Sequence, residues 1–322
     1  MYAENPAVVK VSLVLGDDLV VLDYTAKLVK SLLIAGNPEL ERVFGASGVL
    51  KPIHITPLYV HRQGRGGAEA AEPVYARYVP KGSTAKPPSA GHIKPVRLEA
   101  GREYFFYVGV SSQLLSEVLH SLSSTHDFPF GRTLVAVEEL RYEVNYVDVD
   151  VEAEQARKLL EAPGASVKVT FESPTLLKDP LTVGGRRWAK TFLPLPEAVL
   201  SAPAYMLLAD TGRLKLFKKL MLYAKSVLST PYTVLKTANI AWYIYDGRPL
   251  PALIGYVKYR VDPQQLSHIA KLAKTKHNID LADTLAKTLT LAKTYGVGDG
   301  RAAGFGHTTV KITADHNSLS KS

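Results

Sequence analysis

Gly296-Val-Gly-Asp-Gly-Arg-Ala-Ala-Gly-Phe-Gly306, close to the C-terminus, places five glycines within eleven residues. The pattern is Gly-apolar-Gly at both ends, with one arginine between them. A backbone without Cβ atoms can approach a bound ligand closely. A helix C-cap followed by a turn would account for one or two of these glycines. All five together predict a loop that binds a ligand through its main chain.

The segments on either side of this loop exclude two nucleotide-binding motifs. A helical pattern over 281–295 precedes the loop, and a strand-like run over 307–313 follows it. A dinucleotide-binding fingerprint has the reverse order, because it follows a strand and opens a helix. No Gly-Lys-Ser/Thr follows the glycines, so the loop is not a phosphate-binding P-loop either.

The composition favours a folded protein that binds a polyanion. The 322 residues suffice for two domains with cores of their own, and a hydrophobic content of 46% excludes a disordered chain. A net charge of +9 and a pI near 9.4 favour nucleic acid or an anionic membrane surface as a partner. The absence of cysteine excludes disulfides, cysteine-ligated zinc and thiol catalysis.

Neither a secretion signal nor a membrane span is expected. The first residues lack a basic region ahead of an apolar one, and no run approaches the roughly eighteen apolar residues of a span. Apart from His54 and His307, the histidines show no metal-ligand spacing. We therefore expect a cytoplasmic protein without a metal or another cofactor.

The pattern of residues 1–150 predicts one ferredoxin-like domain. Strand-like and helical segments follow the order of a βαββαβ unit, a sheet with helices on one face. An insertion over 63–100 separates the second and third strands, and its segments 75–79 and 93–98 predict a small hairpin. The expected strands are 7–16, 51–62, 103–111 and 133–149, and the expected helices are 23–35 and 113–122.

Residues 151–322 predict a second domain with the same order of elements. A helix-prone stretch ends at Pro163-Gly164, a hairpin turns at Asp246-Gly247, and the last long helix breaks near Asn278. The glycine-rich loop 296–306 then leads into the last strand. The fold class is therefore α+β, with two tandem ferredoxin-like domains. The expected elements are helices at 151–161, 197–208, 214–228 and 264–295 and strands at 167–172, 232–245, 249–261 and 307–313.

The eleven-residue pattern, set between a helix and a strand, resembles the glycine-rich loop of the RAMP superfamily (repeat-associated mysterious proteins). These are RNA-binding proteins of CRISPR systems, built from ferredoxin-like, RRM-like folds. Within the superfamily, the chain resembles the CRISPR-associated endoribonucleases that process precursor CRISPR RNA at its repeats. Further segments resemble that family: Phe171-Glu-Ser-Pro-Thr175, Ile254-Gly-Tyr-Val-Lys-Tyr259, and Asn37-Pro-Glu-Leu40 followed by Lys51-Pro-Ile-His-Ile-Thr-Pro-Leu58.

The resemblance implies a reaction that needs neither a metal nor a cofactor. Family members cut CRISPR repeat RNA by attack of a ribose 2′-hydroxyl on the adjacent phosphate, which leaves a 2′,3′-cyclic phosphate and a 5′-hydroxyl. This chemistry needs a base, an acid and a cation for the crowded phosphate. The family's usual histidine lies in the loop after the first helix, but loop 42–50 of this chain has none. In this respect the chain resembles archaeal members that rely on lysines and an arginine.

Three lysines are candidates for the base, the acid and the cation. Lys27 and Lys30 are i and i+3 on the first predicted helix, so they lie on one face, and Lys51 begins the next strand. Their mutual repulsion would lower the pKa of one of them and make it a proton shuttle. Tyr24, one turn before Lys27, would orient the hydroxyl, and His54 is the nearest histidine. The alternative is that Lys27 and Lys30 are ordinary solvated helix charges.

The predicted RNA contacts lie in the glycine loop, in a second basic segment and on the hairpin. They combine accessible main chain with cationic or stacking side chains. They are Gly296, Gly298, Gly300, Arg301, Gly304, Gly306 and His307 in the loop, Arg186 and Arg187 in the basic segment, and Lys236, Arg248 and Lys258 on the hairpin.

Two rival interpretations stay open at this point. A RAMP-fold subunit would hold CRISPR RNA in an effector complex without cutting it; the missing histidine favours this rival, and the three lysines oppose it. An enzyme of unrelated fold would instead bind a small phosphate compound with its glycine loop. A homodimer and a transient contact with a CRISPR effector complex are open as well.

Overall fold

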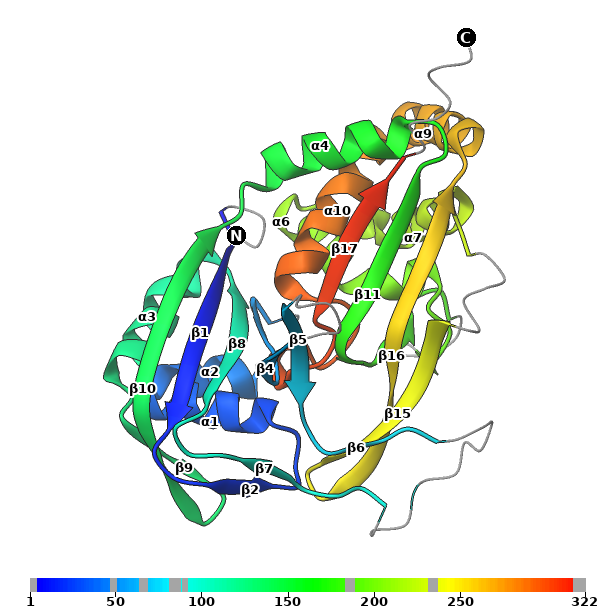
Figure 1. The fold of residues 1–322 in the computed structure, drawn as a ribbon. Coiled ribbons are helices and arrows are strands. Elements are labelled where there is room, and N and C mark those ends of the chain that lie inside the picture. Colours follow the sequence, from blue (N-terminus) through cyan, green and yellow to red (C-terminus); the bar gives the residue numbers. More distant parts are fainter. Residues whose placement is uncertain are drawn as a thin grey trace.

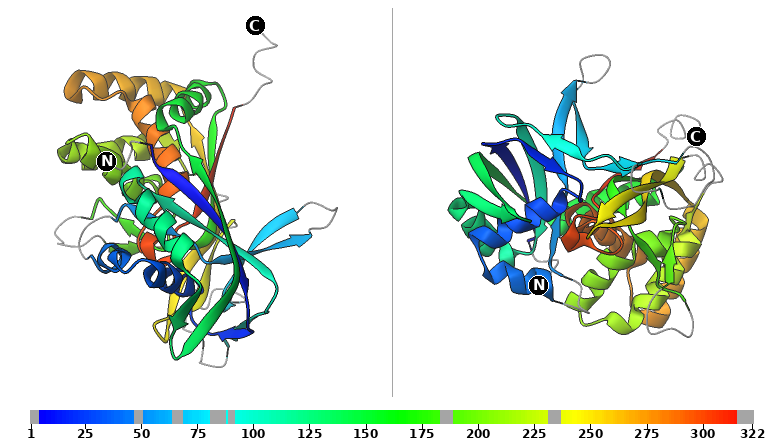
Figure 2. Two further views of the ribbon diagram at one scale, coloured as in Figure 1. Left: turned by 90° about the vertical axis from the view of Figure 1, so that its left-hand side faces the viewer. Right: turned by 90° about the horizontal axis from the view of Figure 1, so that it is seen from below.

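The computed structural model describes residues 5–46, 51–63, 69–80, 88, 92–182, 189–230 and 237–314. Two antiparallel sheets stand side by side, each with helices on one face (Figure 1). The helices of both sheets lie on the same side of the molecule, which leaves the other faces of the sheets open (Figure 2). The predicted α+β class with two ferredoxin-like units is therefore confirmed.

The first sheet is built around β1 (Ala7–Leu15), which pairs antiparallel with β8 (Glu103–Val110) and β10 (Thr133–Tyr146). Side chains alternate along a strand, so every second residue of β1 is buried, while Lys10 and Ser12 face the open side. The other elements of this unit are α1 (Ala26–Gly36), α2 (Glu39–Gly45), β3 (Ile53–Ile55), β4 (Leu58–Gln63), β5 (Glu69–Val74), α3 (Ser112–Ser124) and β9 (Asp127–Phe130). The order of the sheet is β5-β4-β8-β1-β10-β9, with β3 beside β8.

The strand predicted over 51–62 is split into β3 and β4. Pro57 lies at the break and has no N–H to donate to a neighbouring strand. The hydroxyl of Thr56 accepts a hydrogen bond from the N–H of Tyr107 at 2.9 Å, which holds the break against β8. His54 lies in β3, ahead of this break, and its ring contacts His307 of the second unit.

The small hairpin predicted within the insertion 63–100 is wrong. Strand β6 (Arg77–Tyr78) pairs with β15 (Ala238–Tyr245) of the second sheet, and β7 (Val96–Leu98) pairs with β2 (Leu19–Val21). β6 thus extends the second sheet, whereas β7 and β2 form a separate two-stranded sheet. The insertion thereby joins the two units.

The second sheet has the order β17-β11-β16-β15-β6, so the first and third long strands of the unit lie at its centre, as in the first sheet. The hairpin of β15 and β16 turns at Asp246 (φ 52°) and Gly247 (φ 70°), as predicted. Asn278, with φ 49°, separates two helices and confirms the predicted break. The remaining elements are β11 (Ser166–Thr175), β12 (Leu177–Asp179), β13 (Ala189–Thr191), α5 (Pro196–Val199), α6 (Ser201–Asp210), α7 (Phe217–Val227), β14 (Leu228–Ser229), β16 (Arg248–Val261), α9 (Pro263–His277), α10 (Leu281–Tyr295) and β17 (Thr308–Thr313).

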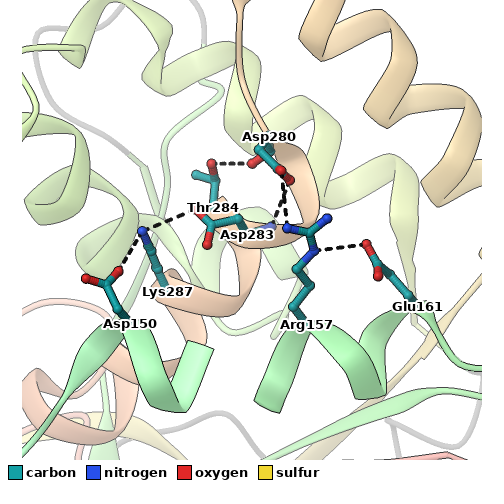
Figure 3. Close-up of polar contacts among 7 residues, drawn as sticks. All are labelled: Asp150, Arg157, Glu161, Asp280, Asp283, Thr284 and Lys287. Atoms are coloured by element: carbon teal, nitrogen blue, oxygen red, sulfur yellow. Dashed lines mark hydrogen bonds and ion pairs between the residues drawn. The ribbon is translucent and has the colours of Figure 1, made fainter. Parts of the chain in front are cut away.

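Helix α4 (Val149–Glu161) connects the two sheets and packs on α10. Arg157 pairs with Glu161 at 3.2 Å and with Asp280 at 3.4 Å, and Lys287 pairs with Asp150 at 2.8 Å (Figure 3). These side chains are partly exposed, so each pair contributes at most about 1 kcal/mol. The Arg157–Asp280 and Lys287–Asp150 pairs join α4 to α10, whereas the Arg157–Glu161 pair lies within α4. The division of the chain at residue 150 stays a prediction.

Among the described residues, no helix is long and apolar enough to cross a membrane. No group of three or more His, Cys, Asp or Glu side chains there is placed to hold a metal ion.

Candidate functional site

The glycine-rich loop 296–306 folds back on itself between α10 and β17. The N–H of Val297 donates to the carbonyl of Gly306 at 2.8 Å, and the N–H of Phe305 donates to the carbonyl of Gly300 at 3.2 Å. All five glycines have a positive φ, between 69° and 95°, which other residues adopt only with strain. The backbone of the loop thus explains why five glycines occur so close together.

The space beside these glycines is occupied, by the loop itself at Gly300 and Gly306 and by other parts of the protein at Gly298 and Gly304. A Cβ at Gly304 would lie well under 3.0 Å from the Cβ of Ala26, and one at Gly298 would come as close to the carbonyl of Leu176. The sequence predicted an open backbone, whereas the structure packs the loop against α1 and the end of β11. Direct RNA contact by Gly296, Gly298, Gly300, Gly304 and Gly306 stays a prediction.

Hydrogen bonds and one aromatic stack anchor the loop to both units. The carbonyl of Gly304 accepts hydrogen bonds from the hydroxyls of Tyr24, at 2.7 Å, and Ser173, at 3.0 Å. The ring of Tyr24 stacks on Phe305 with 4.9 Å between the ring centroids. Burial, and then the neighbouring tyrosines, raise the pKa of Tyr24 well above its usual value. Tyr24 is thus placed as an anchor, and its predicted part in orienting a hydroxyl stays untested.

Arg301 turns its guanidinium into the protein. The side chain is only 4% exposed, and it donates to the carbonyls of Tyr295 at 3.0 Å and Lys51 at 3.5 Å. Arg301 therefore holds the main chain at the start of β3 and brings a fixed positive charge to that point. Its direct contact with RNA stays a prediction.

A hollow of about 310 Å³ lies between α1, α2 and the glycine loop, and we call it the lysine cleft. Its walls include Lys30, Lys51, Phe44 and residues 298–303. Lys30 Nζ lies 5.4 Å from the centre of the Phe44 ring, and the ammonium of Lys51 donates to the Phe44 carbonyl. Burial, and then the positive charge of Lys30, lower the pKa of Lys51. The structure thus brings together two of the three predicted lysines.

Lys27, the third predicted lysine, is held by two carboxylates. Its Nζ lies 2.7 Å from Asp23 and 2.6 Å from Asp246 at the turn of the β15–β16 hairpin. Burial alone would lower the pKa of Lys27, but the hydrogen bonds to both carboxylates outweigh it, and the pKa is raised. Lys27 therefore connects α1 to the second unit, and a catalytic role for it stays a prediction.

His54 and His307 meet on the other side of the glycine loop. His54 Nδ1 lies 3.1 Å from the carbonyl of Arg301, and its Nε2 lies 3.3 Å from His307 Nδ1. Since a carbonyl only accepts, Nδ1 of neutral His54 carries the proton, and His307 Nδ1 donates to His54 Nε2. Burial, and then the neighbouring His307 and Arg301, lower the pKa of His54 far below its usual value, and burial lowers the pKa of His307 to about 4. Both histidines are therefore neutral at pH 7.

The open faces of the sheets carry further groups suited to RNA. The ring of Tyr107 stacks on His307 with 5.4 Å between centroids. Lys258 lies opposite Lys168 on β11, and Lys168 lies opposite Lys311 on β17, so three lysines cross three strands. Like charges placed opposite one another destabilise a sheet, and a polyanion relieves the repulsion. Lys168 and Lys311 were not predicted from the sequence, although the alternation along their strands places them on one face with Lys258.

The remaining predicted RNA contacts are only partly described. Arg248 is exposed at the start of β16, beside the hairpin turn. Arg186, Arg187 and Lys236 lie outside the described residues.

Comparison with known proteins agrees with this fold and with the glycine loop. Residues 169–308, which include the whole loop, match the family model of the CRISPR-associated endoribonuclease Cas6. A Cas6 product complex has a TM-score of 0.59 and 16% identity, covering 96% of this chain and 100% of that chain. Thermus thermophilus Cas6 has a TM-score of 0.51 and 15% identity, covering 95% and 98%. The product of a Cas6-related gene from Pyrococcus furiosus has the same TM-score of 0.51 at 9% identity, covering 95% and 98%.

No curated protein matches the chain in sequence. The family match nevertheless confirms, for the second unit, the resemblance that the glycine loop predicted. The solved structures support the two ferredoxin-like units over almost the whole chain.

Proposed function

We propose that the chain is an endoribonuclease that processes CRISPR repeat RNA, and that the lysine cleft is where it cuts. The reaction would be attack of a ribose 2′-hydroxyl on the adjacent phosphate, which leaves a 2′,3′-cyclic phosphate and a 5′-hydroxyl without a metal. One observation carries the proposal: Lys30 and Lys51 face the same hollow, and the loop that matches the Cas6 family forms its wall.

Lys51 is suited to move the proton in this reaction. Its lowered pKa increases the fraction of free amine, which can accept the proton of the 2′-hydroxyl. The proton then passes from Lys51 to the departing 5′-oxygen. The hydrogen bond from Lys51 to the Phe44 carbonyl directs the amine, and the Arg301 guanidinium holds the main chain of Lys51.

Lys30 is suited to stabilise the crowded phosphate. Its ammonium lies at the edge of the same hollow, and the positive charge that lowers the pKa of Lys51 also attracts the phosphate oxygens. The buried Arg301 adds a second fixed cation at the wall. The positive row of Lys168, Lys258 and Lys311 would hold more distant RNA phosphates on the open sheet face.

The decisive experiment is incubation of the protein with end-labelled repeat RNA in EDTA, beside the same RNA with a 2′-deoxy nucleotide at the cut. We expect one cut in the ribose substrate and none in the deoxy substrate. Tight binding of several authentic repeats without a cut would support the RNA-holding subunit instead. Tight binding of a small nucleotide without affinity for RNA would support the unrelated phosphate-binding enzyme. A homodimer, a contact with an effector complex and a cytoplasmic location stay predictions.

A further inference from the structure

A second hollow lies next to the lysine cleft, on the far side of Asp299, and the proposed reaction does not use it. Asp299 lines both hollows. The second one has a volume of about 100 Å³ and lies between the β12–β13 hairpin, the start of β16 and the glycine loop. Its floor is apolar, with Leu176, Leu250 and Pro251, and Phe192 stands at its side.

Phe192 is unusually exposed for a large apolar side chain. It follows β13 directly and is 42% exposed. Hydrogen bonds order the turn after it: the N–H of Leu193 donates to Thr191 Oγ1 at 3.1 Å, and the N–H of Leu195 donates to the carbonyl of Leu193 at 2.8 Å. An exposed aromatic ring next to an ordered turn and beside a hollow is a platform on which a base can stack.

Charged groups surround this apolar floor in a pattern that fits a nucleotide. Lys178 and Lys190 lie opposite each other on β12 and β13, and both line the hollow. Lys178 Nζ lies 2.6 Å from a carboxylate oxygen of Asp299, so one donor and one acceptor stand side by side. Lys190 is exposed at the rim, where a phosphate can reach it. The apolar floor can accommodate the ring of a base, and the charged groups at the rim can hydrogen-bond to the edge of that base and to its phosphate.

The size of the hollow restricts what it can bind. A volume of about 100 Å³ is below the roughly 300 Å³ at which pockets for whole small molecules begin. One base ring can enter while its ribose and phosphate stay outside. Since Asp299 separates this hollow from the lysine cleft, that base would belong to a nucleotide next to the one being cut.

We propose that this hollow is a base-binding subsite for a nucleotide that flanks the scissile phosphate. The base stacks on Phe192, its edge meets the Asp299–Lys178 pair, and its phosphate faces Lys190. This inference rests on the proposed function, because it names the part of the RNA that the same site recognises.

The test is a double-mutant cycle between Phe192→Ala and abasic nucleotides placed one at a time on both sides of the cut. We expect one abasic position to lower the kcat/KM of the wild-type protein roughly tenfold. At that position alone, Phe192→Ala should cause little further loss. Phe192→Tyr, which keeps the ring, should restore the wild-type response. Tyr146→Ala removes an aromatic ring that is 70% exposed on β10 and is the matched control. If the loss from Phe192→Ala and the loss from the abasic nucleotide add at every position, the subsite is refuted.

The two proposals fail in different ways in this experiment. If the wild-type protein cuts the intact repeat and the losses are additive at every position, the proposed nuclease activity is supported and the subsite is refuted. If the wild-type protein binds the repeat but does not cut it, the nuclease is refuted. The same cycle is then measured as binding affinity, and non-additive losses at one position would still support the subsite, whereas additive losses would refute it.

Discussion

The two sides of the glycine loop carry ionisable side chains in very different surroundings. On the helix side, Lys30 and Lys51 line an open hollow, and burial together with the charge of Lys30 lowers the pKa of Lys51. On the sheet side, His54 and His307 are packed against each other, and burial keeps both neutral. Histidine is the usual proton carrier near neutral pH. Here its place beside the loop favours a structural role, and the lysines line the open hollow in which we propose that RNA is cut.

The strongest test of this contrast is Lys51→Ala. Loss of the proton shuttle should lower the cleavage rate by roughly 10²–10⁴-fold, measured in single turnover on labelled repeat RNA. Lys51→Arg should fail as well, because arginine keeps the charge but does not release a proton near neutral pH. Lys218→Ala, on the exposed face of α7, is the control and should cut at the wild-type rate. Wild-type cleavage by Lys51→Ala would remove the lysine cleft as the site of cutting.

The loop that separates the two sides should tolerate substitution poorly. Gly304→Ala places a Cβ against Ala26 at a φ of 95°, so overlap and backbone strain act together. We expect a loss of about 3 kcal/mol in the free energy of unfolding, measured with urea. Gly212→Ala is the matched control, because φ is 66° there and nothing lies within 4 Å of the added Cβ. If both variants lose the same free energy of unfolding, backbone strain alone accounts for the need for glycine at position 304, and packing against Ala26 does not contribute.

The stability of the protein should depend on acid because of the His54–His307 pair. The unfolded chain takes up protons as the pH falls through about 6.5, whereas folded His307 does so only near its pKa of about 4. Its contribution to stability is therefore present above pH 6.5 and is lost as the pH falls toward 4, by at most about 3 kcal/mol. His307→Asn should reduce the slope of unfolding free energy against pH in that window, and the part of the slope that His54 causes should remain. His268→Asn, exposed on α9, should keep the wild-type slope; the same slope in His307→Asn would contradict the assignment.

Local patterns in the sequence were sufficient to predict both units. The alternation along β1 and the Asp246-Gly247 turn each depend on neighbouring residues, and so does the break at Asn278. The partners of β6 and β7 could not be predicted in this way, because the edges they join lie far away in sequence.

The same distinction between neighbouring and distant residues applies to the candidate site. Lys30, on α1, and Lys51, two residues before β3, were predicted to converge, and both line the lysine cleft. The glycines were interpreted as room for a ligand, since nothing in their own segment shows that Ala26 fills the space beside Gly304. Lys27 has the same helical spacing as Lys30, but its direction depends on Asp246, which lies 219 residues further along the chain.

Lys27→Ala has the smallest expected effect, and it tests whether Lys27 belongs with the lysines of the cleft. If it only joins α1 to the β15–β16 hairpin, Lys27→Ala should change the cleavage rate by no more than a few-fold and the stability by about 1 kcal/mol or less, because its side chain is 29% exposed. A double-mutant cycle with Asp246→Ala, followed by urea unfolding, would show coupling between the two side chains. If Lys27 stabilises the phosphate, Lys27→Ala should instead slow cleavage as strongly as Lys30→Ala does. Asp246→Ala should then leave the rate close to that of the wild type, because it removes a competing carboxylate and no catalytic group.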